Sequence, residues 1–179
     1  MKRFSVCAPV LTALSLVLCT AAWAEGSGEE LRDHADRAIK NLKSADSALT
    51  NFFEHSAGYV VFPSVTRTGP NLAGPQVRGI LYEKGKPAGE AVLTEINVGR
   101  LERVNPFHEA IFFETGEALG NFKQGRFVLS TDIKAVAAAE GVALNVRYRR
   151  GAAVFTIPKS GLIETVTIGD QKFSYRSLD

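Results

Sequence analysis

A continuous apolar run, Tyr59-Val60-Val61-Phe62, constrains the fold of this chain more than any other stretch. Gly58 and Pro63 bound it, and an apolar run of this length is typical of a strand that is buried on both faces. Because proline lacks a backbone N–H, we expect the hydrogen-bonding run of the strand to end at Pro63. A Gly/Pro-rich loop leads on to Gly79, and the whole stretch contains no catalytic residue set. It therefore favours a binding protein over an enzyme.

Strand patterns dominate the chain beyond this run. We predict strands at 79–83 and 91–98, joined by the turn 84–87, and another at 110–113. Later strands are expected at 142–149, 152–157, 162–168 and 171–176, the last two joined by the turn dipeptide Gly169-Asp170. Residues 126–139 are rich in alanine, but Phe127, Leu129, Ile133, Ala135 and Ala137 share one face at a period of two. We therefore predict that this segment is mainly strand.

Helical spacing is confined to a few short segments. In the segment 29–43 the apolar residues fall on one stripe, which we expect to cover the core rather than enter lipid. These residues are Leu31, Ala35, Ala38, Ile39 and Leu42. A second short helix is predicted from about Asp46, with Ser44 or Asp46 as its cap and with Leu49, Phe52 and Phe53 on it. Thr115 is expected to cap a third helix that runs through Phe122.

Together these elements predict an α+β fold. We expect a largely antiparallel sheet, curled towards a partial barrel of about seven to eight strands, with two to three short helices, two of them N-terminal. The predicted organisation is a signal peptide over residues 1–24, an N-terminal amphipathic helix over 25–45 and one domain over 46–179.

The first 24 residues have the features of a secretory signal. Lys2 and Arg3 precede an apolar stretch, and Ala22-Trp23-Ala24 matches a small-residue cleavage site. Cleavage after Ala24 would give a periplasmic or secreted protein. The alternative is a lipoprotein signal ending at Cys19, but a large residue, Leu18, stands where a small one is preferred. Since Cys7 and Cys19 both lie in this segment, the mature chain would carry no disulfide.

The charge balance gives no reason to expect a nucleic-acid partner. The whole chain has a formal net charge of +2, with 21 basic and 19 acidic residues. Loss of Lys2 and Arg3 with the signal would bring this to zero. Attraction to an anionic surface must then come from a local patch rather than from the charge of the whole protein.

No pattern for catalysis, metal binding or cofactor binding is evident. His34, His55 and His108 lack a second histidine at ligand spacing, and we interpret His108 as a surface residue. Ser160 has no glycine two residues before it, so it forms no nucleophile elbow. The Gly/Pro-rich loop lacks the Lys-Ser/Thr pair of a phosphate-binding P-loop. We expect no enzyme activity, no cofactor and no metal.

An arginine cluster near residue 150 is the best candidate site. On a strand at 142–149, alternation places Leu144, Val146 and Tyr148 inward and Asn145, Arg147 and Arg149 outward. The predicted anion-binding residues are Arg147, Arg149, Arg150 at the following turn, Lys159 across the next strand, and Arg67 in the opening loop. Bidentate contacts to lipid phosphates suit these side chains. The alternative is that they protect a strand edge or pair with Glu164 and Asp170.

Three stretches of the chain resemble the SYLF domain family. Residues 59–65, YVVFPSV, resemble its apolar strand ending in Phe-Pro. Residues 111–122, from Ile111-Phe112-Phe113-Glu114-Thr115 to Phe122, resemble its strand-into-helix segment. Residues 159–169, which begin Lys159-Ser160-Gly161-Leu162-Ile163, resemble its late Ser-Lys-Gly-Leu-Phe strand. The resemblance covers about Asp46 to Tyr175, in the expected order.

The resemblance implies a non-catalytic module of the cell envelope that binds phospholipid or a membrane surface. The alternative is an envelope protein-interaction scaffold without lipid affinity. Two glycine-dense stretches of the family differ here. The first keeps Gly69, Gly74 and Gly79 but also contains Pro70 and Pro75, and the second is replaced by the charged residues 99–108.

Overall fold

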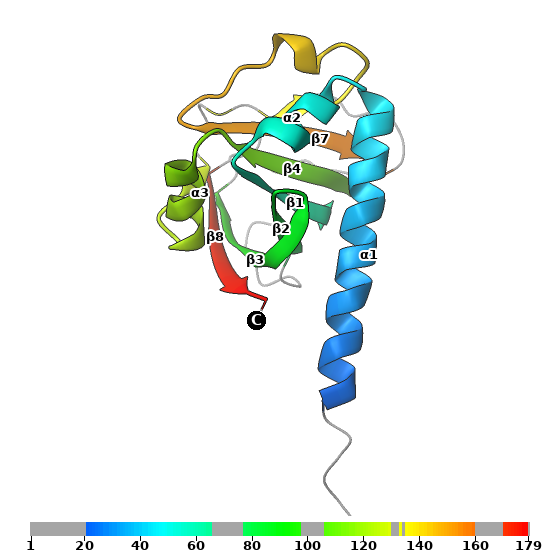
Figure 1. Ribbon diagram of the computed structural model, residues 1–179, viewed down its shortest axis with the longest axis vertical. Coiled ribbons are helices and arrows are strands. Elements are labelled where there is room, and N and C mark those ends of the chain that lie inside the picture. The colour runs from blue at the N-terminus through cyan, green and yellow to red at the C-terminus, as the bar shows by residue number, and fades with distance from the viewer. Residues whose placement is uncertain are drawn as a thin grey trace, which may run out of the picture.

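The structure is a computed structural model that describes residues 21–65, 77–97, 106–129, 133, 135–159 and 170–178. Within these residues, helices cover one face and one side of a curled sheet (Figure 1). The helices are α1 (Ala21–Ala45), α2 (Leu49–His55), α3 (Gly116–Lys123) and the 3₁₀ helix η1 (Ala143–Asn145). The strands are β1 (Gly58–Val65), β2 (Val77–Glu83), β3 (Lys86–Asn97), β4 (Phe107–Phe113), β5 (Val128–Leu129), β6 (Val136–Ala137), β7 (Ala152–Pro158) and β8 (Asp170–Ser177).

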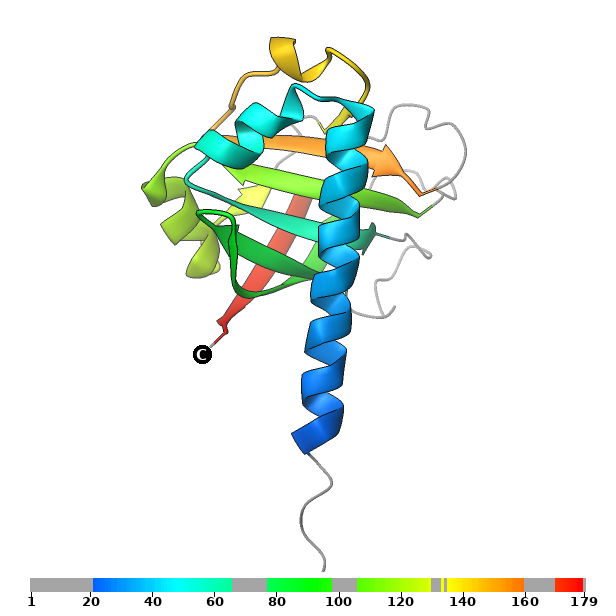
Figure 2. The same ribbon diagram turned by 45° about the vertical axis from the view of Figure 1, so that its right-hand side comes forward.

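The described strands form one eight-stranded sheet in the order β5-β8-β3-β2-β1-β4-β7-β6. Neighbours are antiparallel except for β6 and β7, which are parallel. The two edge strands, β5 and β6, are close in sequence. The chain from Leu129 to Val136 can therefore span only about 25 Å, even when it is fully extended. The sheet curls into a half-barrel (Figure 2). The predicted α+β fold with a curled, largely antiparallel sheet is confirmed.

Both faces of the central strands β1 and β4 are buried, as predicted for the run 59–62. Alternate residues of β1 contribute to two different cores: Val60 and Phe62 point into the half-barrel, and Tyr59 and Val61 point to its outer face. The same alternation separates Ile111 and Phe113 from Ala110 and Phe112 on β4. A period of two thus appears as two buried faces instead of one buried and one exposed face.

Helices α1 and α2 cover the outer face. Ala35, Ala38 and Leu42 of α1 are fully buried against the sheet, and Leu31 and Ile39 are partly buried beside them. The predicted stripe therefore covers the core. The Tyr82 hydroxyl of β2 donates a hydrogen bond of 2.7 Å to Asp36 Oδ1, which adds a polar contact. The N-terminal part of α1 extends beyond the sheet (Figures 1 and 2).

Helix α3 packs into the half-barrel, and Thr115 caps it as predicted. The Thr115 side chain accepts a hydrogen bond from the backbone N–H of Ala118 at 3.2 Å. This contact satisfies one of the donors that a helix N-terminus leaves open. Leu119 and Phe122 are buried in the inner core, where the Phe122 ring lies 4.9 Å from the Phe113 ring.

Pro63 does not end its strand, contrary to the prediction. The pairing of β1 with β4 continues from Phe62 opposite Glu109 to Val65 opposite Phe107, with a register shift between them. A bulge therefore accommodates the missing N–H of Pro63. The carbonyl oxygen of Pro63 is instead hydrogen-bonded to Nδ1 of His108, at 2.6 Å. His108 is consequently buried, and its interpretation as a surface residue is wrong.

The prediction of a strand over 142–149 is also wrong. Residues 143–145 form η1, and only Arg149 makes a strand-like bridge, to Ala152. Gly141 has a positive φ of 77°, and its N–H and that of Ala143 bond to the Asp46 carboxylate, which turns the chain away from an extended path.

Other predicted elements differ in extent or lie outside the described residues. Among its described residues, the segment 126–139 contains only the short strands β5 and β6, and Ala137 is exposed rather than on a buried face. Helix α2 has Ala48, not Ser44 or Asp46, at its N-cap position. The predicted strand 162–168 is outside the described residues.

Candidate functional site

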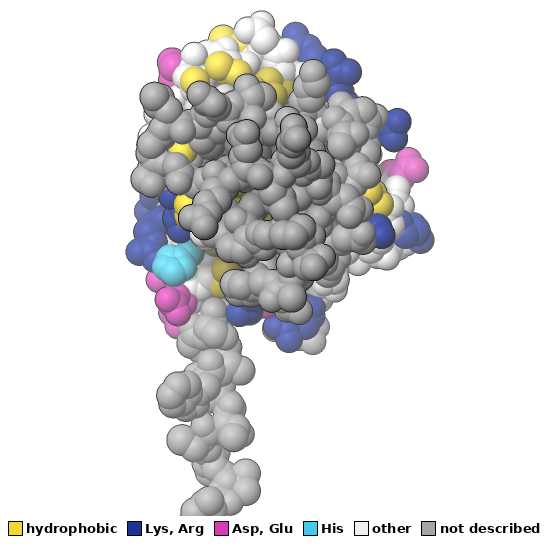
Figure 3. Space-filling model, turned by 180° about the vertical axis from the view of Figure 1, so that it is seen from behind, with side chains coloured by type: hydrophobic (Ala, Val, Ile, Leu, Met, Phe, Trp, Pro, Cys, Tyr) yellow, Lys and Arg dark blue, Asp and Glu magenta, His cyan; other side chains and the backbone are white. Residues whose placement is uncertain are grey.

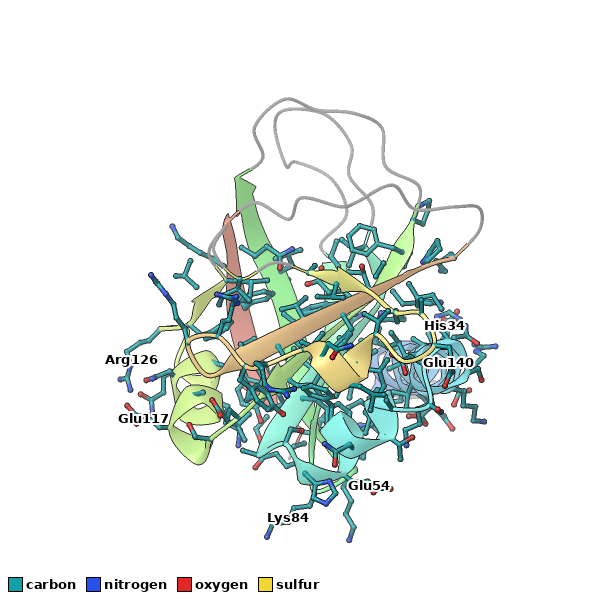
Figure 4. All side chains as sticks on the ribbon, turned by 90° about the horizontal axis from the view of Figure 1, so that it is seen from above. His34, Glu54, Lys84, Glu117, Arg126 and Glu140 are labelled. Atoms are coloured by element: carbon teal, nitrogen blue, oxygen red, sulfur yellow. The ribbon has the colours of Figure 1, made fainter. Side chains whose placement is uncertain are left out.

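A groove of about 650 Å³ lies between α2 and the segment 143–148. Seen from above, η1 lies between α2 and β7 (Figure 4). Its apolar lining includes Phe52, Leu144, Val146 and Tyr148. Its polar lining includes Asn51, His55, Glu114 and Arg147. The groove thus combines apolar surface with groups of both charges.

The wall of the groove is fixed by two acidic side chains. Asp46, in the turn between α1 and α2, is fully buried and accepts three backbone hydrogen bonds, from Ala48 at 3.0 Å, Gly141 at 3.2 Å and Ala143 at 2.7 Å. In the opposite direction along the chain, the Glu140 carboxylate accepts a 2.8 Å hydrogen bond from the Ser47 hydroxyl. These contacts attach the segment 140–143 to the start of α2 and set the width of the groove.

The floor of the groove is continuous with the outer core. The ring of Phe52 lies 5.4 Å from that of Tyr148, 5.5 Å from that of Phe112 and 5.0 Å from that of Phe155. Burial, together with the charge of Glu114, raises the pKa of Tyr148 to about 12. The Tyr148 hydroxyl is therefore protonated at neutral pH and can donate a hydrogen bond.

Leu144 and Arg147 stand together at the rim. Leu144 is 68% exposed, so it points outward and not inward as predicted. The guanidinium of Arg147 donates through Nη1 to the backbone carbonyls of Leu144 at 3.1 Å and Val146 at 3.2 Å. The guanidinium is thereby held at the backbone of the residue that carries the exposed apolar side chain.

Arg149 and Arg150 follow at the hairpin turn into β7. Arg149 pairs with Ala152 through two backbone hydrogen bonds, and Arg150 and Gly151 form the turn with φ values of 51° and 75°. Arg147 and Arg149 also line a second hollow of about 300 Å³ beside Ala152 and Val154. Figure 3 shows hydrophobic side chains at this end of the molecule with Lys and Arg side chains next to them. Arg147 and Arg149 of the predicted cluster thus line one hollow, and Arg150 follows Arg149 in the turn.

Lys159 does not join the arginine cluster. It follows Pro158 at the far end of β7, where its backbone N–H bonds to the carbonyl of Pro106. The length of β7 separates it from the Arg150 turn, a distance of roughly 20 Å. Arg67 lies outside the described residues.

Sequence patterns did not single out two further polar groups. Glu109, Thr156 and Gln171 are buried inside the half-barrel, where Gln171 Nε2 lies 3.5 Å from Glu109 Oε2. Arg78, Glu90 and Arg176 meet on the outer face of β2, β3 and β8. The alternation of residues along a strand shows which face of the sheet each side chain lies on. It does not show which strands are neighbours, so it could not bring these residues together.

Two further observations concern the residues that the structure describes. Among these residues, no group of three or more His, Cys, Asp or Glu side chains is placed to hold a metal ion. No helix within the described part of the chain is long and apolar enough to span a bilayer. In comparisons with known proteins, no family model and no curated protein matches the chain.

Proposed function

We propose that this protein is a non-catalytic module of the cell envelope, periplasmic or secreted, that docks on anionic phospholipid through the groove between α2 and η1. The observation that carries this proposal is the position of exposed Leu144 directly beside the Arg147 guanidinium. A lipid surface offers a phosphate for the cation and an apolar layer for the leucine. The resemblance of the sequence to the SYLF family supports the same assignment.

The expected energies indicate reversible docking. Each arginine near an anionic surface contributes about 1 kcal/mol. Burial of one leucine side chain adds about 2 kcal/mol. Arg147, Arg149, Arg150 and Leu144 together would then supply roughly 5 kcal/mol, which corresponds to weak binding. The exposed charges would also be screened by salt, so binding should weaken as ionic strength rises.

Sedimentation with phosphatidylglycerol-containing vesicles tests this proposal. We expect the purified protein to bind these anionic vesicles at low salt and to bind them less at high salt. It should not bind zwitterionic vesicles. The double variant Arg147→Glu/Arg149→Glu should lose at least tenfold in binding. The matched control is Arg37→Glu/Lys40→Glu, which makes the same charge change on the exposed face of α1. Equal losses in both variants would exclude the groove as the site, and no binding at either salt concentration would exclude the function.

The alternative function is an envelope protein-interaction scaffold. It is favoured by Val128, which is 43% exposed on the edge strand β5. Edge strands present backbone groups to which another chain can pair. Pull-down from delipidated envelope extract separates the two functions, because a scaffold captures a partner without any affinity for vesicles. Val128→Lys should then abolish capture, whereas the Arg147/Arg149 charge reversal should leave it unchanged.

A further inference from the structure

A third hollow, of about 420 Å³, lies on the outer face of β2, β3 and β8, away from the groove between α2 and η1. Its lining residues are Arg78, Glu90, Val92, Ser174, Tyr175 and Arg176. Strand register explains how they meet, because Val92 pairs with Arg78 on one side and Ser174 on the other. Glu90 pairs with Arg176 in the next row.

One carboxylate holds two guanidinium groups in this hollow. Glu90 Oε2 accepts from Arg78 Nη2 at 2.7 Å and from Arg176 Nη2 at 3.1 Å. Burial alone would raise the pKa of Glu90, but the hydrogen bond and charge of Arg78, and then those of Arg176, outweigh it and lower that pKa. Glu90 is therefore ionised at neutral pH. Two positive charges and one negative charge leave this triad with a net charge of +1.

The triad has donors to spare for a ligand. A guanidinium carries five N–H donors, and the contact with Glu90 uses one nitrogen of each arginine. The side chain of Glu90 is only 9% exposed, whereas that of Arg176 is 76% exposed. The carboxylate thus sits at the base of the hollow and fixes the separation of the two cations, while the arginines face the solvent.

We propose that this hollow binds a monocarboxylate, through Arg78 and Arg176, with its apolar part against Val92. A planar carboxylate suits the paired donors of a guanidinium. A ligand with one negative charge neutralises the triad, whereas a phosphate dianion would leave the site with a net charge of −1 beside the buried Glu90 carboxylate. Ser174 supplies a hydroxyl that can donate to the bound carboxylate. A small organic acid and the free C-terminus of a peptide share this chemistry.

The test is an NMR titration of the arginine side-chain Nε–Hε signals in the purified protein. The probes are acetate, a short peptide with a free C-terminus, its amidated twin and inorganic phosphate. We expect the free-acid probes to shift the Arg78 and Arg176 signals saturably and the amidated peptide to leave them unchanged. Tighter binding of the peptide than of acetate would identify a chain terminus as the ligand. Similar affinities would identify a small acid.

Variants distinguish a binding site from an ion-pair network that only joins strands. Arg176→Gln should weaken carboxylate binding about tenfold, the loss of one charge-assisted hydrogen bond. Glu90→Gln should strengthen it, because the net charge of the triad rises to +2. Arg147→Gln, in the groove, should leave it unchanged, which separates this site from the proposed lipid site. The proposal is overturned if no free acid saturates the signals, if phosphate binds more tightly than carboxylate, or if Arg176→Gln has no effect.

Discussion

The carboxylate of Asp46 accepts a 2.7 Å hydrogen bond from the backbone N–H of Ala143, a residue 97 positions later in the chain. This contact joins the turn between α1 and α2 to the start of η1. Since these two segments form the walls of the groove, the shape of the candidate lipid site depends on one buried acidic side chain.

Replacing Asp46 by alanine should therefore destabilise the protein. The change leaves three backbone N–H groups without their acceptor, and two of them lie in the segment that carries Leu144 and Arg147. We expect the free energy of unfolding to fall by about 2–4 kcal/mol, measured by urea denaturation followed by circular dichroism. Glu140→Ala is the control, because its contacts with Ser47 are exposed and should cost less than about 1 kcal/mol. Equal small losses in both variants would show that Asp46 does not hold the groove.

Gly79 should tolerate no side chain. A Cβ atom at this position would lie 2.6 Å from Cδ1 of Phe62 and 2.6 Å from the carbonyl oxygen of Val61. Gly79→Ala should therefore cost about 1–3 kcal/mol and lower the melting temperature. Gly120→Ala is the matched control, because no atom beyond the neighbouring backbone of its own helix lies within 4 Å of its Cβ position and it is in the interior of α3. That variant should be stabilised by up to about 1 kcal/mol. A melting temperature for Gly79→Ala equal to that of the unmodified protein would contradict the close packing of β1 and β2.

The local part of the fold follows from sequence patterns. The apolar run 59–62, the cap at Thr115 and the stripe from Leu31 to Leu42 each depend on residues within a few positions of one another. Each is found in the structure as predicted. Periodicity and capping report short-range preferences, which agree with the tertiary structure in these segments.

The remaining features depend on contacts between distant residues. Alternation alone predicted a strand around Leu144, but the bonds from Asp46 to Gly141 and Ala143 override it. Alternation also cannot show that Lys159 lies at the opposite end of β7 from Arg150, because it gives the face of a residue and not its distance along the sheet. His108 appeared to be a surface residue because its acceptor is the carbonyl of Pro63, 45 positions earlier.

His108 should make the stability of the protein depend on pH. Burial lowers its pKa in the folded state and the charge of Lys159 lowers it further, while the hydrogen bond with Pro63 acts in the opposite direction. Between this lowered value and the usual value near 6.5, the unfolded chain binds a proton that the folded chain does not. Stability is therefore fully present above about pH 6.5 and falls as the pH drops towards the folded pKa, by at most about 1.4 kcal/mol per pH unit.

Urea denaturation at a series of pH values between about 7.5 and 5 measures this effect. His108→Gln should be less stable at neutral pH, because it disturbs the contacts with Asn41 and Pro63. Its unfolding free energy should nevertheless decline less steeply with acid than that of the unmodified protein. His34→Gln, on the exposed face of α1, is the control and should keep the original slope. An identical slope in the His108 variant would show that another group causes the dependence.

The apolar residues of the groove should separate into two classes when they are substituted. Leu144 is exposed at the rim, so Leu144→Ser should change the free energy of unfolding by less than about 0.5 kcal/mol. It should still weaken sedimentation with anionic vesicles several-fold, because a leucine contributes about 2 kcal/mol when it enters an apolar layer. Phe52 packs against three aromatic rings, so Phe52→Ala should cost about 3–5 kcal/mol of stability. If Leu144→Ser binds vesicles as well as the unmodified protein, the exposed leucine takes no part in docking and the arginines act alone.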